Sequence, residues 1–598
     1  MWHSSVLLCL HAILRISLVN TAENEQFIDA CIDEVYCKGE ILKVVQMSKA
    51  FGDAKTFVDM PMRDDRSKIV TPLKDAVSGQ KSAADIKKAV KKYFYEAGTE
   101  LTSIQPSDWS ENPPFLLKIN DPSLRGWAKD IHNRWKLLNR KMKKEVKTNP
   151  ERYSLIYSEN PFVVPGGRFR EFYYWDTYWV INGLLLSDMA ETVKGMLQNF
   201  ITLVKDRGFV PNGGRKYYLN RSQPPFLSLM VYEYWKKTND TNFLTESLPY
   251  LEKEYQFWMT NRTITLDKTD GFKNAHSVNR FSTPMGYPRP ESYWNDVETM
   301  EKAGIHNGTE RKQLYAHIAS AAESGWDFSS RWFSYSGKHA MEMMSIKTRD
   351  IIPVDLNSIL CKVEKSISDM HAANGNSAKA KQFATAYQGR VTTMNEVFWD
   401  ESKKQWLDFD IKLKKKRSAF YVSNISPIWA DCYGNNASRA KEAIRSIKRQ
   451  GVLDYPGGVP TTLNETGEQW DFPNAWPPLQ DMMENALRKA GNITGNDLAF
   501  DLARKWIETN YLSWKQTGHM YEKYDANIRG KPGHGGEYGV QVGFGWTNGV
   551  VLQFLDRYGQ RLKAPKYKPP DSSAPYPRVA IEALLTLLIL TLMLTNFH

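Results

Sequence analysis

The chain has 598 residues, of which 42% are hydrophobic and 24% are charged, so it is long enough to bury a substantial core. Its net charge of +12 is scattered along the chain, and the one dense basic run covers residues 412–417. Strand-like segments flank this run. We therefore interpret it as a solvated hairpin turn and expect no nucleic-acid partner.

The N-terminus carries a short apolar run with a cleavage site near its end, which predicts a signal peptide over residues 1–22. Short helical patches and an extended stretch follow, and residues 128–146 predict a basic amphipathic helix. Strand-like segments are few, and no repeat of 20–50 residues is present. Residues 23–564 therefore predict a single mainly α domain with an N-terminal extension.

Helical periodicity dominates the rest of this domain. Apolar residues recur at helical spacing over residues 193–204, 356–370 and 383–398, which predicts three amphipathic helices. Further helices are predicted over residues 244–260, 310–324, 437–449, 478–489, 496–510 and 546–558. We expect these helices to form pairs, with functional loops between them.

The C-terminus ends in a second apolar segment. Residues 580–594 are mostly Leu, Ile, Thr and Ala, which predicts a glycolipid-anchor signal. Residues 565–574 are then a linker with the candidate attachment site, and residues 575–598 are a hydrophobic propeptide. A transmembrane span is the alternative, but it needs about 20 apolar residues and Glu582 interrupts this segment. We expect delivery through the secretory pathway to the cell surface and a lipid-anchored membrane partner.

Cysteines and glycosylation sequons agree with secretion. Cys31 and Cys37 are close enough in sequence to close a small disulfide loop in an oxidising compartment. Cys361 and Cys432 either pair or stay buried, and both possibilities remain open. No metal-ligand spacing is present, so we expect no metal. Sequons occur at Asn220, Asn239, Asn261, Asn307, Asn436, Asn464 and Asn492, and at Asn424, where proline follows.

Loops rich in both charged and aromatic residues separate the predicted helices. Residues 165–179 begin with a Pro-Gly-Gly break and then contain two arginines, two carboxylates and seven aromatic residues. Arginine forks and carboxylates bind the hydroxyls of a pyranose sugar, and flat rings cover its CH faces. The same residue types recur at residues 208–214, 220–225, 288–292, 323–332, 469–478, 521–525 and 533–549. We expect these loops to converge at one end of the fold and to build one pocket.

Hydrolysis of a glycosidic bond needs one protonated and one ionised carboxyl group, and it needs no cofactor. Asp327 suits the protonated role, because Gly325 lets the backbone approach closely and Trp326 and Phe328 exclude water. The alternative is that Asp327 caps a helix beginning at Phe328. Motifs for serine hydrolases, phosphate-binding loops and zinc proteases are absent from the sequence.

The ionised role has two candidates. Glu522 lies between Tyr521 and Lys523, and the lysine would favour its charged form. A surface ion pair between Glu522 and Lys523 is equally consistent with the sequence. Glu537, in a glycine-rich loop, is a rival, and the residues alone do not rank it against Glu522.

Several of these loops resemble the signature stretches of a known family. The chain resembles the trehalases of glycoside hydrolase family 37, of the membrane-anchored animal type, at residues 165–179, 289–291, 323–327, 469–478 and 535–548. The resemblance implies an (α/α)6 barrel, or toroid, with long functional loops and a few short strands. It also implies hydrolysis of α,α-trehalose to two glucose molecules with inversion of configuration.

By this resemblance Asp327 is the general acid and Glu522 is the general base. Inversion then predicts that their carboxyl groups lie roughly 6.5–9.5 Å apart. One departure from the family pattern is His534, which interrupts the glycine run. Family positions that bind the sugar match Arg168, Trp175, Asp176, Asn212, Arg221, Ser222, Gln223, Arg289, Pro290, Glu291, Gly325 and Glu537.

Two rival functions remain at this stage. One is a related (α/α)6 glucosidase that acts on a different glucoside. The other is a catalytically inactive trehalose-binding surface protein, against which the intact pair of Asp327 and Glu522 argues.

Overall fold

The computed structural model describes residues 27–434, 436–490 and 493–567. The predicted signal peptide, the hydrophobic propeptide and most of the predicted linker lie outside these residues, as does the sequon at Asn492. None of the described helices combines the length and the apolar composition that a membrane-crossing segment needs.

An inner ring of six helices, counted within the described residues, forms the centre of the molecule. Each helix contacts the next in chain order, and the last contacts the first. These helices have few exposed positions because other elements surround them, and residues 477–484 and 545–552 are buried without exception. The ring consists of α8 (Asp176–Leu186), α10 (Leu227–Thr238), α14 (Val354–Ala373), α16 (Ser426–Trp429), α18 (Pro477–Lys489) and α20 (Gly545–Tyr558).

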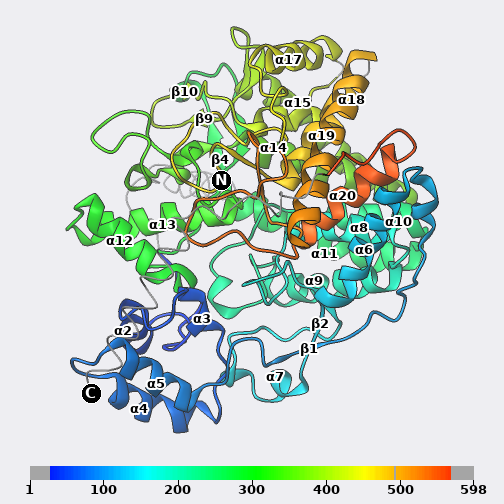
Figure 1. Cartoon of the computed structure of the whole chain (residues 1–598). Coiled ribbons are helices and arrows are strands. Elements are labelled where there is room, and N and C mark those ends of the chain that lie inside the picture. The colour runs from blue at the N-terminus through cyan, green and yellow to red at the C-terminus, as the bar shows by residue number, and fades with distance from the viewer. Residues whose placement is uncertain (1–26, 435, 491–492, 568–598) are drawn as a thin grey trace, which may run out of the picture.

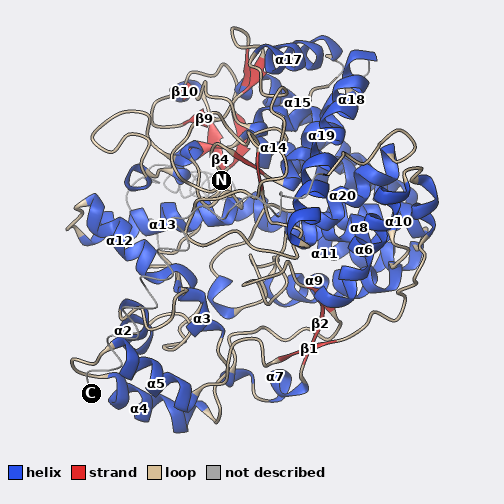
Figure 2. Cartoon of the chain, viewed as in Figure 1, coloured by secondary structure: helices blue, strands red, loops and turns tan. Residues whose placement is uncertain are grey.

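A second set of helices lies outside the ring. Five of them each follow an inner helix in the chain, and four of these five pack against the helix that they follow. The sixth, α6, precedes α8 and packs against α20. This arrangement confirms the predicted mainly α, (α/α)6 toroid (Figures 1 and 2). The outer helices are α6 (Pro122–Leu138), α9 (Ala190–Arg207), α11 (Thr241–Asn261), α15 (Ser377–Thr393), α17 (Ala437–Arg449) and α19 (Ile493–Thr517).

Helices α8 and α20 approach each other so closely that only glycine fits at their contact. A Cβ atom added to Gly549 would lie 2.0 Å from the carbonyl oxygen of Trp179. A Cβ atom added to Gly183 would lie 2.8 Å from the Cα atom of Gly549. The absence of two side chains therefore brings the loops that precede α8 and α20 together at one end of the ring.

The N-terminal extension forms its own lobe with a separate apolar core (Figure 1, lower left). The predicted disulfide between Cys31 and Cys37 is confirmed and lies just before the first helix of this lobe. The core of the lobe continues into the toroid through Tyr173, Tyr217 and Tyr218. Its helices are α2 (Glu40–Met47), α3 (Ala54–Asp59), α4 (Arg66–Val77) and α5 (Ala83–Tyr93).

The described strands are short and antiparallel, and they connect loops. The pair β11 and β12 joins the loop before α18 to the loop before α20, with Asn474 opposite Asp525. The three-stranded sheets are β1 (Leu101–Ser103), β2 (Asn139–Met142) and β3 (Phe162–Val163), and β6 (Ile351–Ile352), β9 (Phe409–Asp410) and β10 (Lys415–Lys416). The pairs are β4 (Thr263–Leu266) with β5 (His276–Asn279), β7 (Trp399–Asp400) with β8 (Gln405–Trp406), and β11 (Asn474–Ala475) with β12 (Tyr524–Asp525).

Two predictions about local structure need correction. The helix predicted over residues 128–146 ends at Leu138, because the next residues pair as β2 between β1 and β3. A short helix, α7 (Lys144–Thr148), follows this strand. The basic run does lie in a hairpin, but β10 is part of the run itself. Arg417 is buried, stacks 3.8 Å from the ring of Tyr335 and donates to the carbonyl of Phe333.

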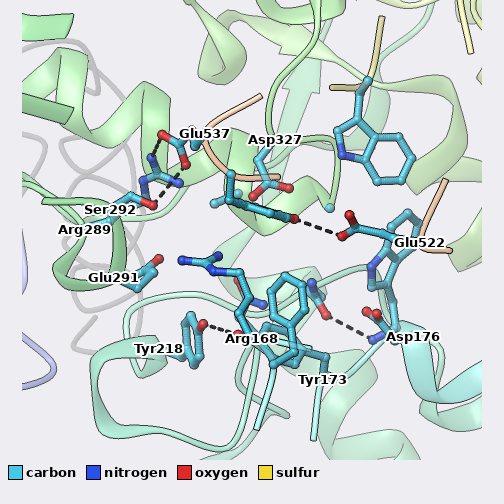
Figure 3. Close-up of a pocket in the computed structure, with 18 of the residues that line it drawn as sticks. Arg168, Tyr173, Asp176, Tyr218, Arg289, Glu291, Ser292, Asp327, Glu522 and Glu537 are labelled. Atoms are coloured by element: carbon cyan, nitrogen blue, oxygen red, sulfur yellow. Dashed lines mark hydrogen bonds and ion pairs between the residues drawn. The ribbon is translucent and has the colours of Figure 1, made fainter. Parts of the chain in front are cut away.

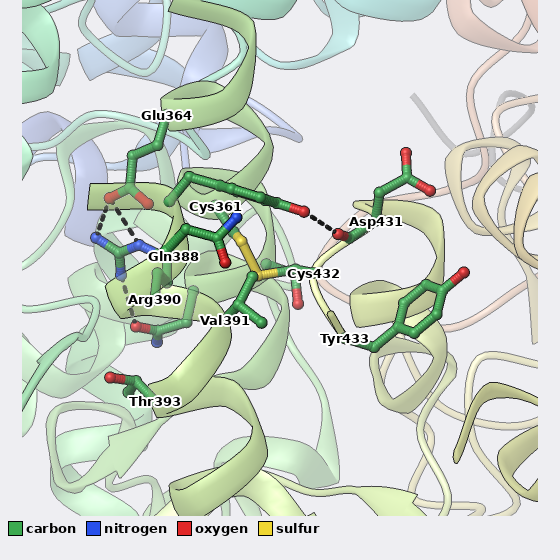
Figure 4. Close-up of a disulfide and its surroundings, with 12 residues drawn as sticks. Cys361, Glu364, Gln388, Arg390, Val391, Thr393, Asp431, Cys432 and Tyr433 are labelled. Carbon is green, nitrogen blue, oxygen red and sulfur yellow. Dashed lines mark hydrogen bonds and ion pairs between the residues drawn. A yellow bond between two sulfur atoms is a disulfide. The ribbon is translucent and has the colours of Figure 1, made fainter. Parts of the chain in front are cut away.

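Cys361 and Cys432 form a disulfide that ties α14 to the chain after α16 (Figure 4). The pairing resolves the alternative that the sequence left open. The sequons at Asn239, Asn261 and Asn307 are exposed, whereas Asn220 and Asn424 are buried. The amide of Asn220 donates to the hydroxyl of Tyr287, so this sequon is engaged in the fold.

Candidate active site

A pocket of about 610 Å³, which we call the mouth, opens at the end of the ring where the inner helices begin (Figure 3). Its walls come from segments that precede or open α8, α10, α14, α18 and α20. The intervening chain before α14 includes α12 (Tyr293–Ala303) and α13 (Gly308–Ser324). The lining residues are Arg168, Phe169, Tyr173, Trp175, Asp176, Asn212, Tyr218, Arg221, Gln223, Arg289, Glu291, Ser292, Ala322, Gly325, Asp327, Trp470, Trp476, Glu522, Glu537, Tyr538, Phe544 and Trp546.

All the predicted site residues line the mouth except Ser222 and Pro290. The hydroxyl of Ser222 donates to the carbonyl of Val210, and its backbone N–H donates to Glu323. The carbonyl of Pro290 accepts a hydrogen bond from Gln46 of the N-terminal lobe. The structure thus places these two residues behind the lining, where they hold the loops in position.

Asp327 follows helix α13 at the edge of the mouth. Gly325 adopts a left-handed conformation with φ of 77°, and a Cβ atom there would lie 2.7 Å from the ring of Trp175. The predicted close approach of the backbone is therefore present. The alternative role as a helix cap is not, because the next helical turn begins at Ser330 and its cap is Ser329.

The surroundings of Asp327 favour its protonated form. Burial raises the pKa of this carboxyl group to about 7, and the negative charge of Glu537 acts in the same direction. The guanidinium group of Arg289 opposes both effects. Because the result lies near neutrality, Asp327 can hold a proton and release it in the same pH range.

Glu522 is buried on the other side of the mouth, in the loop between α19 and α20. The hydroxyl of Tyr538 donates to its Oε1 atom at 3.0 Å, and the indole N–H of Trp546 donates to its carbonyl. Burial raises the pKa of Glu522, while the charge of Lys523 and the Tyr538 hydrogen bond both lower it. The two carboxyls of the mouth thus differ in how strongly their ionised forms are supported.

Lys523 does not form the surface ion pair that the sequence allowed. Its side chain is buried, its ammonium donates to Gln469 at 2.9 Å, and it lies 4.9 Å from the centre of the Trp476 ring. Burial lowers the pKa of Lys523 to about 8. Among the described residues Glu522 makes no ion pair, so it keeps the basicity that direct pairing would reduce.

Glu537, the rival candidate, is held by two partners. Its Oε1 atom pairs with Arg289 at 2.8 Å, and its Oε2 atom accepts from the hydroxyl of Ser292 at 3.0 Å. Arg289 also forms a bidentate pair with Asp296. Glu537 therefore positions an arginine of the mouth, and the geometry favours Glu522 over it as the base.

Arg221 and Glu291 form a second buried pair, with Asn212 accepting from the Nε atom of Arg221 at 2.7 Å. The Nη1 atom of Arg221 and the Oε2 atom of Glu291 have no hydrogen-bond partner within the described residues. A buried donor and a buried acceptor without partners are costly unless a ligand satisfies them. Their positions at the mouth suit a sugar hydroxyl, which can both donate and accept.

Arg168 is fixed by a residue that the sequence analysis missed. Its Nε and Nη2 atoms each donate to a carboxyl oxygen of Asp53 at 2.6 Å. Asp53 caps helix α3 of the N-terminal lobe. The guanidinium lies 4.4 Å from the ring of Tyr538, which in turn donates to Glu522. The N-terminal lobe thereby helps to build the mouth, although none of its residues lines it.

A further carboxyl group of the mouth, that of Asp176, opens helix α8. Burial raises its pKa well above the ordinary value, and the charges of Glu522 and Asp327 add to this effect. Its surroundings therefore favour the protonated form of Asp176, which can donate a hydrogen bond. Figure 3 shows Asp176, Asp327 and Glu522 projecting into the same pocket.

The sequence analysis also missed individual rings of the mouth. Trp470 and Trp476 stack with their centres 3.8 Å apart and an interplanar angle of 1°. Both belong to the loop over residues 469–478, where aromatic residues accompany charged ones. That composition was the feature of the sequence that could have identified them. The other missed lining residues are Phe169, Tyr173, Tyr218, Ser292, Ala322, Tyr538, Phe544 and Trp546.

Comparisons with known proteins show what the chain is similar to. A family model described as Trehalase matches residues 49–559. The chain is 47% identical to a trehalase of Homo sapiens, over 93% of this chain and 94% of that protein. It is 43% identical to a trehalase of Apis mellifera, over 89% and 85% of the two chains. The solved neutral trehalase Nth1 of Saccharomyces cerevisiae matches with a TM-score of 0.54 at 25% identity, covering 66% of this chain and 73% of that one.

Proposed function

This chain belongs to the trehalase family of glycoside hydrolases, and we propose that it hydrolyses α,α-trehalose to two glucose molecules with inversion. In this proposal Asp327 is the general acid and Glu522 is the general base. The observation that carries it is the placement of Asp327 and Glu522 in one pocket. Burial raises the pKa of Asp327 to about 7, whereas Lys523 and the hydrogen bond from Tyr538 lower the pKa of Glu522 against the effect of its burial.

The reaction then follows from the two protonation states. Glu522 accepts a proton from a water molecule, and the water oxygen forms a bond to one anomeric carbon. The bond between that carbon and the bridging oxygen breaks, while Asp327 gives its proton to that oxygen. One glucose leaves as the α-anomer, and the attacked glucose is released as the β-anomer.

The walls of the mouth support a neutral, hydroxyl-rich substrate. The arginines at positions 168, 221 and 289 are each paired with a carboxylate, so they add little net charge. They still direct N–H groups at the pocket in a fixed fork geometry. Indole rings at positions 175, 470 and 476 supply flat apolar surface for the sugar faces.

The experiment that tests this function is proton NMR of α,α-trehalose with the purified protein, followed from the first minutes. Equal early signals from α- and β-glucose are expected. Glucose that appears only as the α-anomer would retain the substrate and overturn the inverting mechanism. Absence of glucose, with binding retained, would favour the inactive binding protein.

The location of the enzyme is a separate part of the proposal. The N-terminal apolar run, the exposed sequons and the two disulfides support secretion, and the C-terminal apolar segment supports a glycolipid anchor. Expression in animal cells followed by treatment with a phosphatidylinositol-specific phospholipase tests the anchor. We expect release of activity into the medium, whereas activity released only by detergent would support a transmembrane span.

A further inference from the structure

A second cavity, which we call the rear cavity, lies at the other end of the inner ring. Its volume is about 1300 Å³, and all six inner helices contribute residues to it. Trp179 separates it from the mouth, since its indole N–H donates to Asp481 of the rear cavity and its ring packs against Trp175 of the mouth. The lining residues are Tyr178, Asn182, Leu185, Leu186, Glu233, Lys236, Lys237, Lys362, Trp429, Asp481, Asn485, Lys489, Gln553, Asp556 and Arg557.

Most of the cations of the rear cavity have a structural explanation. Lys236, Lys237, Lys489 and Arg557 lie in the last turns of their helices, where positive charge stabilises the negative end of the helix dipole. Lys489 and Arg557 are also paired with carboxylates. These residues alone would not indicate a ligand.

Lys362 has no such explanation. It lies in the middle of helix α14, and within the described residues its ammonium forms no ion pair or hydrogen bond. Its contact is with the ring of Trp429, whose centre is 5.1 Å away. Burial lowers the pKa of Lys362 to about 8, and the neighbouring Lys489 adds to this effect. Lys362 is half-buried on an inner helix, and the charges of Asp431, Glu233 and Asp481 support its ionised form without pairing with it directly. An ammonium that lacks a direct partner is available to an anionic ligand.

The rest of the lining holds the carboxylates of Glu233, Asp481 and Asp556, which the five cations outnumber, and amides and rings that suit a hydroxyl-bearing ligand. Asn182, Asn485 and Gln553 line the cavity; the amide of Asn485 is bonded to Asp481 and Arg488, whereas the Nε2 atom of Gln553 is buried without a hydrogen-bond partner among the described residues. The rings of Tyr178 and Trp429 supply apolar surface. We propose that the rear cavity is a second ligand site, for a small anion that carries hydroxyl groups, with a sugar phosphate as the class that fits best.

Isothermal titration of the whole protein with glucose 6-phosphate and with inorganic phosphate tests this site. We expect saturable binding of one glucose 6-phosphate, tighter than that of phosphate. Lys362→Met should weaken it at least tenfold. Lys365→Met is the matched control, because Lys365 lies on the same helix, is half-exposed and pairs with Asp369 at 3.0 Å. It should bind as the wild type does.

Three outcomes would overturn the proposal. They are no saturable binding, equal binding by the wild type and Lys362→Met, and binding of phosphate as tight as that of glucose 6-phosphate. A ligand held in the mouth would give the second outcome, because Lys362 does not line the mouth. Lys362→Gln repeats the test with a polar side chain if the methionine variant does not fold.

Discussion

The two ends of the inner ring are built from the same helices and differ in the sign of the charge that they gather. The mouth lies where α8, α18 and α20 begin, and the rear cavity lies where they end. Helix N-termini favour negative charge and C-termini favour positive charge. Asp176 accordingly opens α8 at the mouth, and the lysines of the last turns gather at the rear.

Burial also changes the pKa values of the charged groups at both ends of the ring. In the mouth it raises the pKa of Asp327 and Glu522, and at the rear it lowers the pKa of Lys362. Each end therefore holds groups whose charged form is only partly favoured. At the mouth this suits the proposed acid and base, and at the rear the ammonium of Lys362 makes no direct ion pair within the described residues.

Removing either carboxyl of the mouth is expected to have the largest effect. Asp327→Asn or Glu522→Gln should lower kcat by about 10³-fold or more, since each removes a proton transfer in the transition state. Glucose release measures kcat, and calorimetry should show trehalose binding and thermal stability largely retained. Wild-type turnover in either variant would remove that residue from its assigned role.

The next prediction concerns the close contact between α8 and α20 at Gly549. Gly549→Ala should lower the free energy of unfolding by about 1–3 kcal/mol, because its Cβ atom would meet the Trp179 carbonyl. Gly126→Ala on α6 is the control, since a Cβ atom there meets nothing within 4 Å. It should be neutral or slightly stabilising. Urea unfolding measures both, and equal midpoints would show that α8 and α20 can separate without cost.

Support of the mouth by the N-terminal lobe can be tested at Asp53. Asp53→Asn should lower kcat/KM by about 10- to 100-fold, because Arg168 loses two charge-assisted hydrogen bonds. Asp65→Asn is the matched control, since Asp65 of the same lobe pairs with Arg152 away from the mouth. Steady-state kinetics should show little change in the control. Similar losses in both variants would mean that the lobe acts only through stability.

The outer helices could be predicted from the sequence, but the inner ones only in part. Helix α17 matches its predicted bounds of 437–449, because one face is buried and the other is solvated. Helices α8 and α10 were not predicted as helices. Residues 176–181 of α8 are buried without exception, so no polar face marks its period. In α8 this burial removes the polar face that identifies a helix, although α18 and α20, whose first eight residues are also buried, were predicted.

The residues of the mouth could likewise be predicted from the sequence only in part. Loops with paired charges and rings identified most of its lining, since charged groups beside aromatic ones are unusual in a core. Asp53 and Asp296 were not identified, because nothing in their own sequence neighbourhoods distinguishes them from surface carboxylates. Asp53 meets Arg168 across 115 residues of chain, and only the fold brings them together.

The smallest expected effect concerns how the mouth sets the proton affinity of Asp327. As the acid, Asp327 works when protonated, so kcat/KM should fall as the pH rises through its pKa of about 7. Glu537→Gln removes a charge that raises this pKa and frees Arg289, which lowers it. Both changes have the same sign, so the alkaline limb should move to lower pH by about one unit.

The matched control for this shift is Ser292→Ala, which removes a hydrogen bond to Glu537 but keeps its charge. Profiles of kcat/KM from acid to alkaline pH should show the limb displaced in Glu537→Gln and in place in Ser292→Ala, whatever their absolute rates. A limb that stays near pH 7 in Glu537→Gln would mean that a different group titrates there. Burial alone would then have to account for the protonation of Asp327, and the charges gathered at this end of the ring would serve binding alone.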